Sequence, residues 1–287
     1  MSDLLALLWA PFLMCLVLTG IHAYLGIHVI AREVVFVDIA LAQIAALGAT
    51  AAFLVGIPLE AWGSYATGLA ATLLGAVILA LSRARQRQVS QEAVIGVVYA
   101  VSTAAAILLI DRAPHGSEHL RAMLVGNILA VNGADVVKVA ALYAVVGAFH
   151  WLWRRQFVLI TLSPEAAFRE GWNVRLWDFI FYASFGVVVT SSVRVAGVLL
   201  VFSYLIVPAL AGTVLGGRLS TRLAIGWAFG TAVSILGVAG SAILDTPTGA
   251  TVVCAFGLSL LILTGFTRVL GLPVLRKEAD GARLRST

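Results

Sequence analysis

Charged side chains are scarce in this sequence: 11% of the 287 residues are Asp, Glu, Lys or Arg, whereas 61% are hydrophobic. Soluble domains contain roughly a quarter charged residues, so too few charges are present here to cover the surface of a soluble globule. The apolar residues fall in long blocks, and about 20 apolar residues suffice for a helix to cross a bilayer. The composition therefore excludes a soluble domain and predicts an integral membrane protein with several transmembrane helices.

Cysteine and lysine are also rare, and each scarcity excludes a class of function. The two cysteines, Cys15 and Cys254, lie within apolar blocks without a Cys-x-x-Cys motif, so we interpret them as small buried hydrophobic residues. Neither lysine, Lys138 or Lys277, follows a glycine, so the sequence has no Gly-x-x-x-x-Gly-Lys phosphate loop. Gly-x-Ser-x-Gly and His-Glu-x-x-His motifs are absent as well. We expect neither ATP hydrolysis nor enzyme activity from this chain.

The net charge of +5 comes from basic residues that lie between apolar blocks, a placement that favours membrane orientation over nucleic-acid binding. With the N-terminus placed outside, the inner segments hold 15 Lys and Arg residues and the outer segments hold four. An odd number of spans then places the C-terminus inside. A shorter block, 120–130, is expected to form a re-entrant or surface helix. The nine predicted spans cover about 4–30, 34–55, 61–81, 92–110, 135–153, 177–193, 196–215, 223–243 and 248–267.

A few polar residues lie inside the apolar blocks, and each is costly to bury there, so each is a functional candidate. They include His22 and His28 in the first block and Asp38 and Gln43 in the second. Imidazole and carboxylate groups together bind divalent cations such as zinc or manganese. Two structural alternatives stay open. A histidine of this kind often bonds to a backbone carbonyl, and Asp38 is placed to interact with the dipole of a helix N-terminus.

The predicted outer side is acidic, with six carboxylates against four basic residues. Such a face concentrates cations near an entrance, so Glu118, His119 and Asp245 are candidate residues of an outer mouth. His115, Glu118 and His119 also have the spacing of side chains that share one face of a helix. A solvated loop is the alternative interpretation of that segment.

The longest connection between predicted spans is the inner loop 154–176. Ser163 suits an N-cap, Pro164 suits the first helical position, and Gly171 suits a C-terminal stop. The spacing predicts a two-turn amphipathic helix over about 163–171. This helix is either a plain surface element or a docking element for another protein.

At this point several motifs, in this order and spacing, resemble the membrane-spanning permease subunits of bacterial ATP-binding-cassette importers for zinc, manganese and iron. The likeness covers about residues 10–270. It is carried by the inner-loop segment Ser163–Gly171, the Val-Ala-Gly-Val-Leu-Leu run at 195–200 with Leu-Ile-Val-Pro-Ala-Leu-Ala at 205–211, Glu-Ala-Val-Ile-Gly at 92–96, and Asp-Thr-Pro-Thr-Gly at 245–249.

The resemblance implies an all-α, polytopic transmembrane bundle of the type II importer class, with about nine spans, the N-terminus outside and the C-terminus inside. Residues 1–270 would form the permease domain and 271–287 a cytoplasmic tail. Ser163, Glu165, Ala166 and Gly171 would belong to the coupling segment that docks on a separate ATPase subunit.

The same resemblance implies the partner subunits of the transporter and its location in the cell. Two permease chains would pair in the bacterial cytoplasmic membrane, and an extracytoplasmic metal-binding protein would deliver the cargo. No cofactor is expected to be bound permanently, since the divalent metal ion is the transported substrate. The implied function is ATP-driven import of zinc, manganese or iron by alternating access.

One departure from the family pattern concerns the second span. The family often carries Gly-Asp-Ala-Leu-Ser-His there, with Asp and His four residues apart, whereas here Gln43 stands five residues after Asp38. Five residues turn an α-helix by ~500°, which places the two side chains about 140° apart. The paired-ligand motif is therefore not intact, and His22 or His28 could supply the missing imidazole. A permease for a metal chelate and a secondary transporter driven by an ion gradient remain alternatives.

Overall fold

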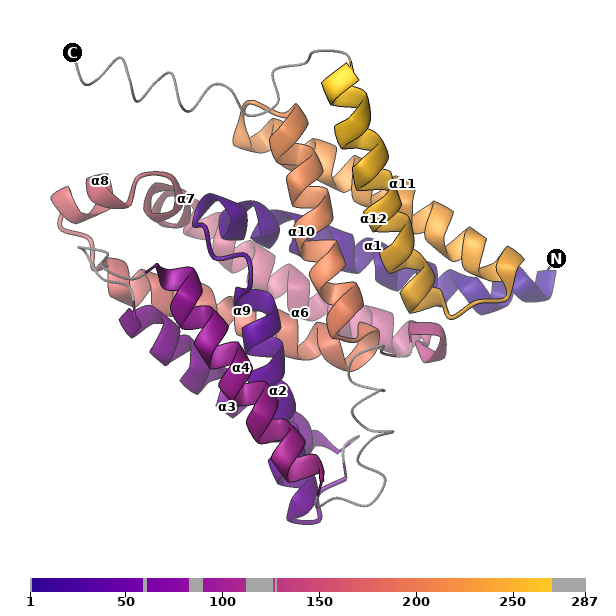
Figure 1. Ribbon diagram of the computed structural model, residues 1–287, viewed down its shortest axis with the longest axis horizontal. Coiled ribbons are helices and arrows are strands. Elements are labelled where there is room, and N and C mark those ends of the chain that lie inside the picture. The colour runs from indigo at the N-terminus through magenta and orange to yellow at the C-terminus, as the bar shows by residue number, and fades with distance from the viewer. Residues whose placement is uncertain (1, 59–60, 83–89, 112–125, 127, 270–287) are drawn as a thin grey trace.

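The computed structural model describes residues 2–58, 61–82, 90–111, 126 and 128–269, with side chains described from residue 8 onward. Within these ranges the chain forms eleven α-helices, one 3₁₀ turn and no strand (Figure 1), which confirms the predicted all-α bundle. The helices are α1 (Ser2–Ala31), α2 (Val37–Leu54), α3 (Trp62–Ser82), α4 (Gln91–Ile110), α6 (Gly133–Leu152), α7 (Arg154–Leu162), α8 (Pro164–Arg169), α9 (Val174–Ala196), α10 (Val198–Leu215), α11 (Leu219–Leu244) and α12 (Thr248–Val269), and the 3₁₀ turn is η1 (Ile128–Ala130).

Among the described residues, nine helices are long and apolar enough to cross a membrane, which confirms the number of predicted spans. Hydropathy also placed their ends well: the largest difference is at the start of α11, expected at residue 223 and observed at residue 219. All helices except α7 and α8 belong to this set. These two short helices occupy the connection between α6 and α9.

The connection 154–176 holds two short helices, whereas the sequence predicted one. The predicted helix is present as α8, and Gly171 beyond its end has φ +79°, in the left-handed region that favours glycine. Ser163 occupies the N-cap position, but its side chain makes no capping hydrogen bond. The physical reason is that Ser163 also terminates α7, with its N–H donating to the carbonyl of Leu159 at 2.8 Å, so one residue serves two helix ends.

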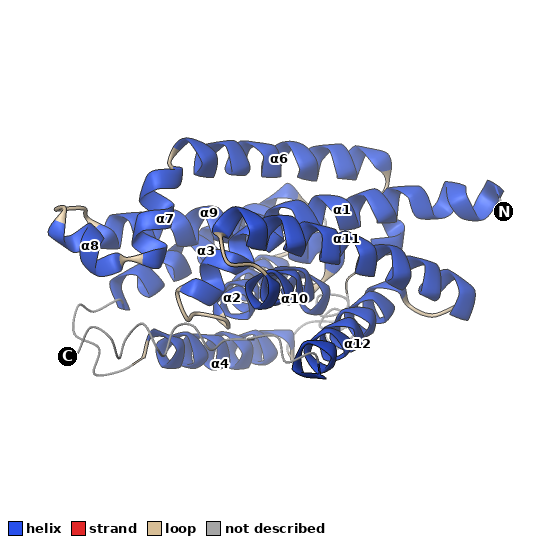
Figure 2. Cartoon of the chain, turned by 90° about the horizontal axis from the view of Figure 1, so that it is seen from above, coloured by secondary structure: helices blue, strands red, loops and turns tan. Residues whose placement is uncertain are grey.

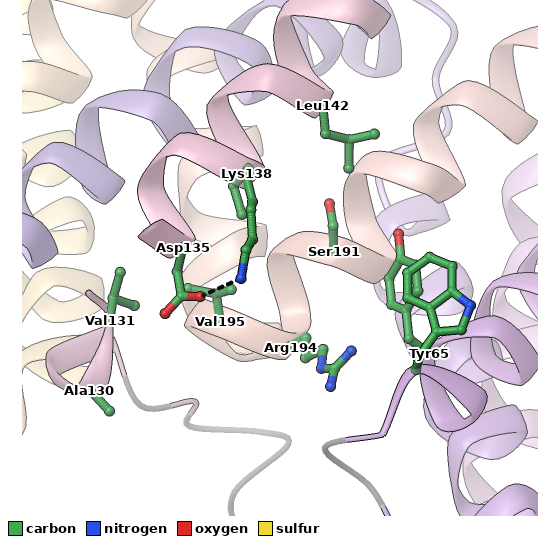
Figure 3. A pocket seen from close by; sticks show the side chains of 11 residues that line it. Tyr65, Ala130, Val131, Asp135, Lys138, Leu142, Ser191, Arg194 and Val195 are labelled. Carbon is green, nitrogen blue, oxygen red and sulfur yellow. Dashed lines mark ion pairs between the residues drawn. The ribbon is translucent and has the colours of Figure 1, made fainter. Parts of the chain in front are cut away.

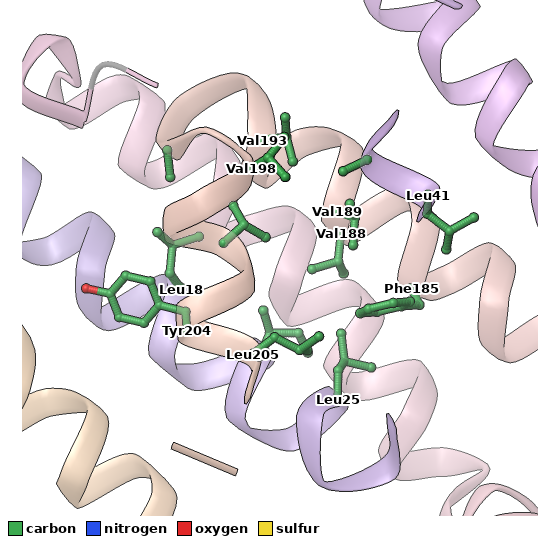
Figure 4. Close-up of a cluster of buried hydrophobic side chains, with 14 of the residues drawn as sticks. Leu18, Leu25, Leu41, Phe185, Val188, Val189, Val193, Val198, Tyr204 and Leu205 are labelled. Carbon is green, nitrogen blue, oxygen red and sulfur yellow. The ribbon is translucent and has the colours of Figure 1, made fainter. Parts of the chain in front are cut away.

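Helix α1 lies at the centre of the bundle, where it packs against α6, α10 and α11, while α2 packs against α3 and α4. Glycines allow these close approaches. A Cβ on Gly26 of α1 would collide with the backbone carbonyl of Leu205 in α10, and one on Gly48 of α2 would lie 2.7 Å from the carbonyl of Thr67 in α3. Small residues at helix contacts are the usual means of packing helices in a membrane. The apolar core between α1, α2, α9 and α10 is shown in Figure 4.

Helices α9 and α10 are joined by a single residue, Gly197, at φ +77°. The backbone of Gly126 packs directly against this junction, since a Cβ there would overlap the carbonyl of Ala196. Of the expected helix at 120–130, the structure describes only Gly126 and the turn η1, whose Ile128 is buried against the bundle. The described part is therefore a turn packed into the bundle and not a surface helix.

The candidate spans differ in the fraction of their residues that is buried inside the bundle. Helices α4 and α12 are the least buried of the candidate spans, at 22% and 11%, and both lie on the side of the molecule opposite α6 (Figure 2). Both cysteines were predicted to be buried. Cys15 is buried, but Cys254 is exposed on α12, so the prediction is wrong for Cys254. A thiol is a small, weakly polar group that is compatible with an apolar exterior, so the apolar block alone does not tell which way it faces.

Candidate functional site

Asp38 is a fully buried carboxyl group without a hydrogen-bond partner. It is the second residue of α2, its exposed fraction is 0%, and neither carboxyl oxygen accepts a hydrogen bond from any residue that the structure describes. Its position in the first turn allows the predicted interaction with the helix dipole. Nearly all buried polar atoms in proteins are hydrogen-bonded, and an unpartnered one in an apolar bundle is costly. Asp38 is thus a site that needs a proton or a cation to complete it.

His22 lies on α1 in a network of hydroxyl groups. Its Nδ1 donates to the carbonyl of Leu18 at 2.9 Å, which is the backbone bond anticipated as the structural alternative. This bond leaves a lone pair on Nε2, which faces the Ser192 hydroxyl at 3.1 Å. The Tyr143 hydroxyl bonds to the same Ser192 oxygen. His22 therefore presents the ring nitrogen that a metal ligand requires toward a polar environment.

The hydroxyl network lies beside a cavity on the surface of the bundle. Tyr143 interacts with Ser191 as well as Ser192, and electrostatically with both Tyr65 and Asp38. Ser191 and Tyr65 in turn line a cavity of about 740 Å³ between α3, α6 and α9. The hydroxyl network thus borders this cavity, and Tyr143 lies within electrostatic range of the buried carboxyl.

Charged side chains surround that cavity, which Figure 3 shows together with its lining residues. Lys138 and Asp135 form an exposed ion pair at 3.8 Å, and the guanidinium of Arg194 lies 5.7 Å from the centre of the Tyr65 ring. The cavity is thus lined by both basic and acidic side chains, which makes it suitable for water and ions.

Sequence reasoning did not single out Tyr143, Ser191 and Ser192, which carry this network. Hydroxyl residues are common inside membrane helices, where they bond to carbonyls of their own helix. Ser191 and Ser192 do so here, by donating to the carbonyl of Val188 at 2.8 and 2.6 Å. The available signal was the run Thr-Ser-Ser at 190–192 in an otherwise apolar helix.

Gln43 is also buried in α2, with an exposed fraction of 6%. Among the described residues, no group of three or more His, Cys, Asp or Glu side chains is placed to hold a metal ion together. Asp38, His22 and Gln43 thus remain predicted pathway residues, and of the three His22 lies beside a hydroxyl group, that of Ser192.

His28 belongs to a different polar group, which we call the Arg32 cluster: Tyr24, His28, Arg32, His150, Thr161, Asp178 and Ser184. Arg32 forms a buried ion pair with Asp178 at 2.8 Å and donates through Nε to the Thr161 hydroxyl at 2.9 Å. Thr161 lies 2.8 Å from Nδ1 of His28.

The hydrogen bonds of Thr161 are compatible with a proton on Nε2 of His28. Because the Thr161 oxygen accepts from Arg32, its hydroxyl hydrogen is free to donate to Nδ1 of His28. A neutral His28 then carries its proton on Nε2, which has no hydrogen-bond partner among the described residues. No bond joins His28 to Asp38 in the described structure. His28 stays a predicted pathway residue, but its geometry is less suited to a metal than that of His22.

The Arg32 cluster fastens α7 to the rest of the bundle. Thr161 comes from α7 and Asp178 from α9, while Arg32 directly follows α1. The guanidinium of Arg32 also lies 3.9 Å from the centre of the Phe181 ring, and His150 of α6 stacks on Phe157 of α7 with the ring centres 4.1 Å apart. Four helices therefore meet in one buried polar group next to α8.

The predicted coupling residues lie on and around α8. Ser163, Glu165 and Gly171 are exposed and Ala166 is half-buried, while Ala167 packs into a small core with Ile160 and Val174. The segment is thus anchored on one side and free on the other. Nothing in the described structure tests whether a partner binds there.

Only one of the three predicted outer-mouth residues can be placed. Glu118 and His119, together with the tail 271–287, lie outside the described residues. Asp245 is exposed and has φ +51°, where it terminates α11 in the left-handed conformation that Asp tolerates better than most residues. This geometry gives Asp245 a role in the turn before α12, and its role in cation entry stays a prediction.

Comparison with known proteins matches residues 5–267 to the model of the ABC 3 transport family. The manganese transport system membrane protein of Listeria monocytogenes is 28% identical over 185 residues, which are 64% of this chain and 66% of that protein, just under two thirds of its length. The high-affinity zinc uptake system membrane protein of Haemophilus influenzae is 26% identical over 267 residues, covering 91% of this chain and 98% of that protein.

A solved structure with the same fold is that of PsaBC from Streptococcus pneumoniae in complex with Fab. It aligns with a TM-score of 0.74 at 21% identity, over 91% of this chain and 93% of the other. At this identity the likeness concerns the fold.

Proposed function

The chain belongs to the ABC 3 transport family, and from this premise we propose that it is the permease subunit of an ATP-driven importer of a divalent metal ion. It is a multi-pass protein of the bacterial cytoplasmic membrane, as its nine apolar helices and its relatives indicate. The observation that carries the proposal beyond the family is Asp38, a buried carboxyl with no partner among the described residues. Ionisable groups in this situation are usually part of an ion pathway.

The donor atoms of the predicted pathway residues favour a hard or borderline ion. They are the carboxylate of Asp38, the amide of Gln43 and the imidazole of His22 with the Ser192 hydroxyl beside it, and no cysteine belongs to this set. Oxygen-rich sites suit manganese, whereas sites with thiolate favour zinc and copper. The relatives named above are a manganese and a zinc transport protein. Manganese is therefore the first ion to test, with iron and zinc next.

Energy for transport would come from a separate ATPase, because this sequence has no phosphate-binding loop. We assign the exposed side of α8, with Ser163, Glu165 and Gly171, as its docking surface. The Arg32 cluster, which holds α7 against α1 and α9, supports this assignment because it would carry a movement of α8 into the spans. The excess of basic residues on the same side favours the cytoplasm for this end and the outside for the N-terminus.

We further assign α4 and α12 as the face that pairs with a second copy of the chain. They are the least buried spans and lie on one side of the molecule (Figure 2). Exposed Cys254 on α12 offers a natural probe, since the other cysteine is buried. Oxidative cross-linking of the assembled protein should give a dimer that a Cys254→Ala variant does not give.

The proposal is tested by metal uptake into proteoliposomes that contain the permease with its ATPase and its metal-binding protein. Uptake of labelled manganese should require ATP and should cease when the ATPase is inactivated. Uptake that follows an imposed ion gradient without ATP would instead identify a secondary transporter. Uptake that appears only with a chelated metal would identify the chelate as the cargo.

Coupling through α8 is tested in the same preparation. A Gly171→Trp variant should keep its fold, because nothing lies within 4 Å of an added Cβ, but the bulky side chain and the strained φ should disturb docking. We expect ATP hydrolysis to persist while metal uptake falls. Unchanged uptake would remove α8 from the coupling surface.

A further inference from the structure

A second cavity lies on a different face of the molecule, between α1, α6, α7 and α11. It is an open groove of about 670 Å³ whose walls are almost entirely apolar. Three of its four helices are candidate membrane spans. In Figure 2 α6 lies opposite α4 and α12, so this groove is remote from the proposed pairing face. The medium beside most of the groove is therefore the lipid bilayer.

Two glycines keep the groove open. A Cβ on Gly20 of α1 would have no neighbour within 4 Å, and one on Gly147 of α6 would only touch Ile21 at 4.0 Å. Both line the groove. Close helix packing does not require glycine at either position, in contrast to Gly26, and their effect is to leave space for an apolar occupant.

One end of the groove is basic. Arg154 and Arg155 line it, both are exposed, and only Trp153 separates them from the end of the α6 span at Leu152. The guanidinium of Arg154 lies over the Trp151 ring at 4.8 Å, and Trp151 is itself 65% exposed. Exposed tryptophan next to arginine just beyond a span is typical of the depth of lipid head groups.

We propose that this groove binds one anionic phospholipid of the leaflet on the α7 side. Its phosphate would bind to Arg154 and Arg155, and an acyl chain would lie along Gly20 and Gly147. The charge of the basic end is complementary to an anionic head group, and basic pockets between membrane helices are known to select such lipids. The apolar walls match an acyl chain and offer little to a free anion.

The bound lipid would also touch the Arg32 cluster. Tyr24 and His150 line the groove, and their side chains are bonded to each other at 3.3 Å. His150 stacks on Phe157 of α7. A lipid in the groove would therefore pack against the residues that position α7 and would restrict its movement.

Native mass spectrometry of the assembled importer in nanodiscs tests this proposal. The nanodiscs would contain phosphatidylcholine with a titrated fraction of phosphatidylglycerol. We expect one phosphatidylglycerol retained per permease chain, in preference to phosphatidylcholine. The Arg154→Gln/Arg155→Gln variant should lose this preference by about tenfold or more, whereas Arg175→Gln, an exposed arginine outside the groove, should keep it.

Groove-filling variants test the acyl-chain part. Gly20→Leu and Gly147→Leu should expel the lipid without unfolding the chain, and a matched Gly240→Leu, which meets only Thr251 at 3.9 Å, should retain it. Thermal stability of each variant separates expulsion from misfolding. Retention by the groove-filled variants, equal retention of both lipids by the wild type, or displacement by glycerol phosphate alone would overturn the proposal. So would conversion of a dimer to a monomer by Gly20→Leu, which would identify a second copy as the occupant.

Discussion

Helix α1 carries two polar regions that differ in how their charges are paired. Toward its middle, His22 joins a network of hydroxyl groups. Tyr143 of this network is within electrostatic range of Asp38, a buried carboxyl without a hydrogen-bond partner among the described residues. Just beyond its end, Arg32 pairs with Asp178 at 2.8 Å and shares Thr161 with His28. The second region satisfies its charges internally, whereas the first has one acidic group left for something that the chain does not supply.

This difference distinguishes buried polar residues that stabilise a membrane protein from those that serve its function. A buried ion pair fixes the geometry of the helices that contribute to it, and removing one partner leaves an uncompensated charge. A lone buried carboxyl does not fix the geometry of helices in this way. Its burial is unfavourable, and ionisable residues in this situation are usually functional. We therefore expect substitutions in the Arg32 cluster to act mainly on stability and coupling, and substitutions near Asp38 to act mainly on transport.

The largest effect on stability should follow from breaking the buried ion pair. Asp178→Ala leaves the Arg32 guanidinium without its carboxylate, and we expect a loss of about 3–5 kcal/mol in the free energy of unfolding. Thermal unfolding of the purified protein in detergent measures it. The double variant Arg32→Met/Asp178→Leu should recover most of the loss. Wild-type stability in the single variant would contradict the structural role of the pair.

The next effect concerns the hydroxyl that Arg32 and His28 share. Thr161→Val keeps the shape of the side chain but removes the acceptor for Arg32 and the donor for His28, at a cost of about 1–3 kcal/mol. Because Thr161 belongs to α7, we also expect more ATP hydrolysed per metal ion transported. Thr213→Val is a matched control, since its hydroxyl bonds only to the carbonyl of Ala209 in its own helix. Equal behaviour of the two variants would show that α7 is not held through this contact.

The outcome of the sequence predictions follows the same division. Hydropathy predicted the nine spans because each is defined by a local run of apolar residues. The sequence also drew attention to His22, His28 and Asp38, since polar residues stand out against that background. It did not reveal that Arg32 meets Asp178, because the two residues are 146 positions apart and their contact depends on how α1 and α9 pack.

A similar limit applies to the hydroxyl network and to the exposed cysteine. Tyr143 and Ser192 come from α6 and α9, and they acquire their role only when these helices place them beside His22. Cys254 lies in an apolar run whose two faces look alike in sequence, so only the packing of α12 shows that it is exposed. Helix α7 was missed because its sequence is too polar for a span and carries no clear cap.

In the hydroxyl network, the Tyr143→Phe variant should lose about 1 kcal/mol in the free energy of unfolding, as expected for one lost hydrogen bond. Its main effect should be a slower uptake of metal, because the hydroxyl belongs to the network beside the cavity and is within electrostatic range of Asp38. Initial uptake rates in proteoliposomes would show this. An unchanged rate would indicate that the ion does not pass the hydroxyl network.

The smallest effect is expected at the exposed ion pair in the cavity. Lys138→Gln removes one partner of a pair at 3.8 Å in which the lysine side chain is 78% exposed. Exposed pairs contribute about 0–1 kcal/mol, and salt screens them. Thermal unfolding at low and high salt should show almost no difference from the wild type. A loss comparable to that of Asp178→Ala would contradict the contrast drawn between exposed and buried pairs.

The central claim, that Asp38 awaits a cation, is tested most directly by ATP-dependent manganese uptake in an Asp38→Asn variant, with thermal stability measured on the same sample. The account predicts uptake lowered by about 10- to 100-fold or more, the range typical of damaged metal sites, while stability is unchanged or increased. Asp111→Asn, at an exposed carboxyl that follows α4, should behave as the wild type in both respects. Normal uptake by the Asp38→Asn variant would contradict the account.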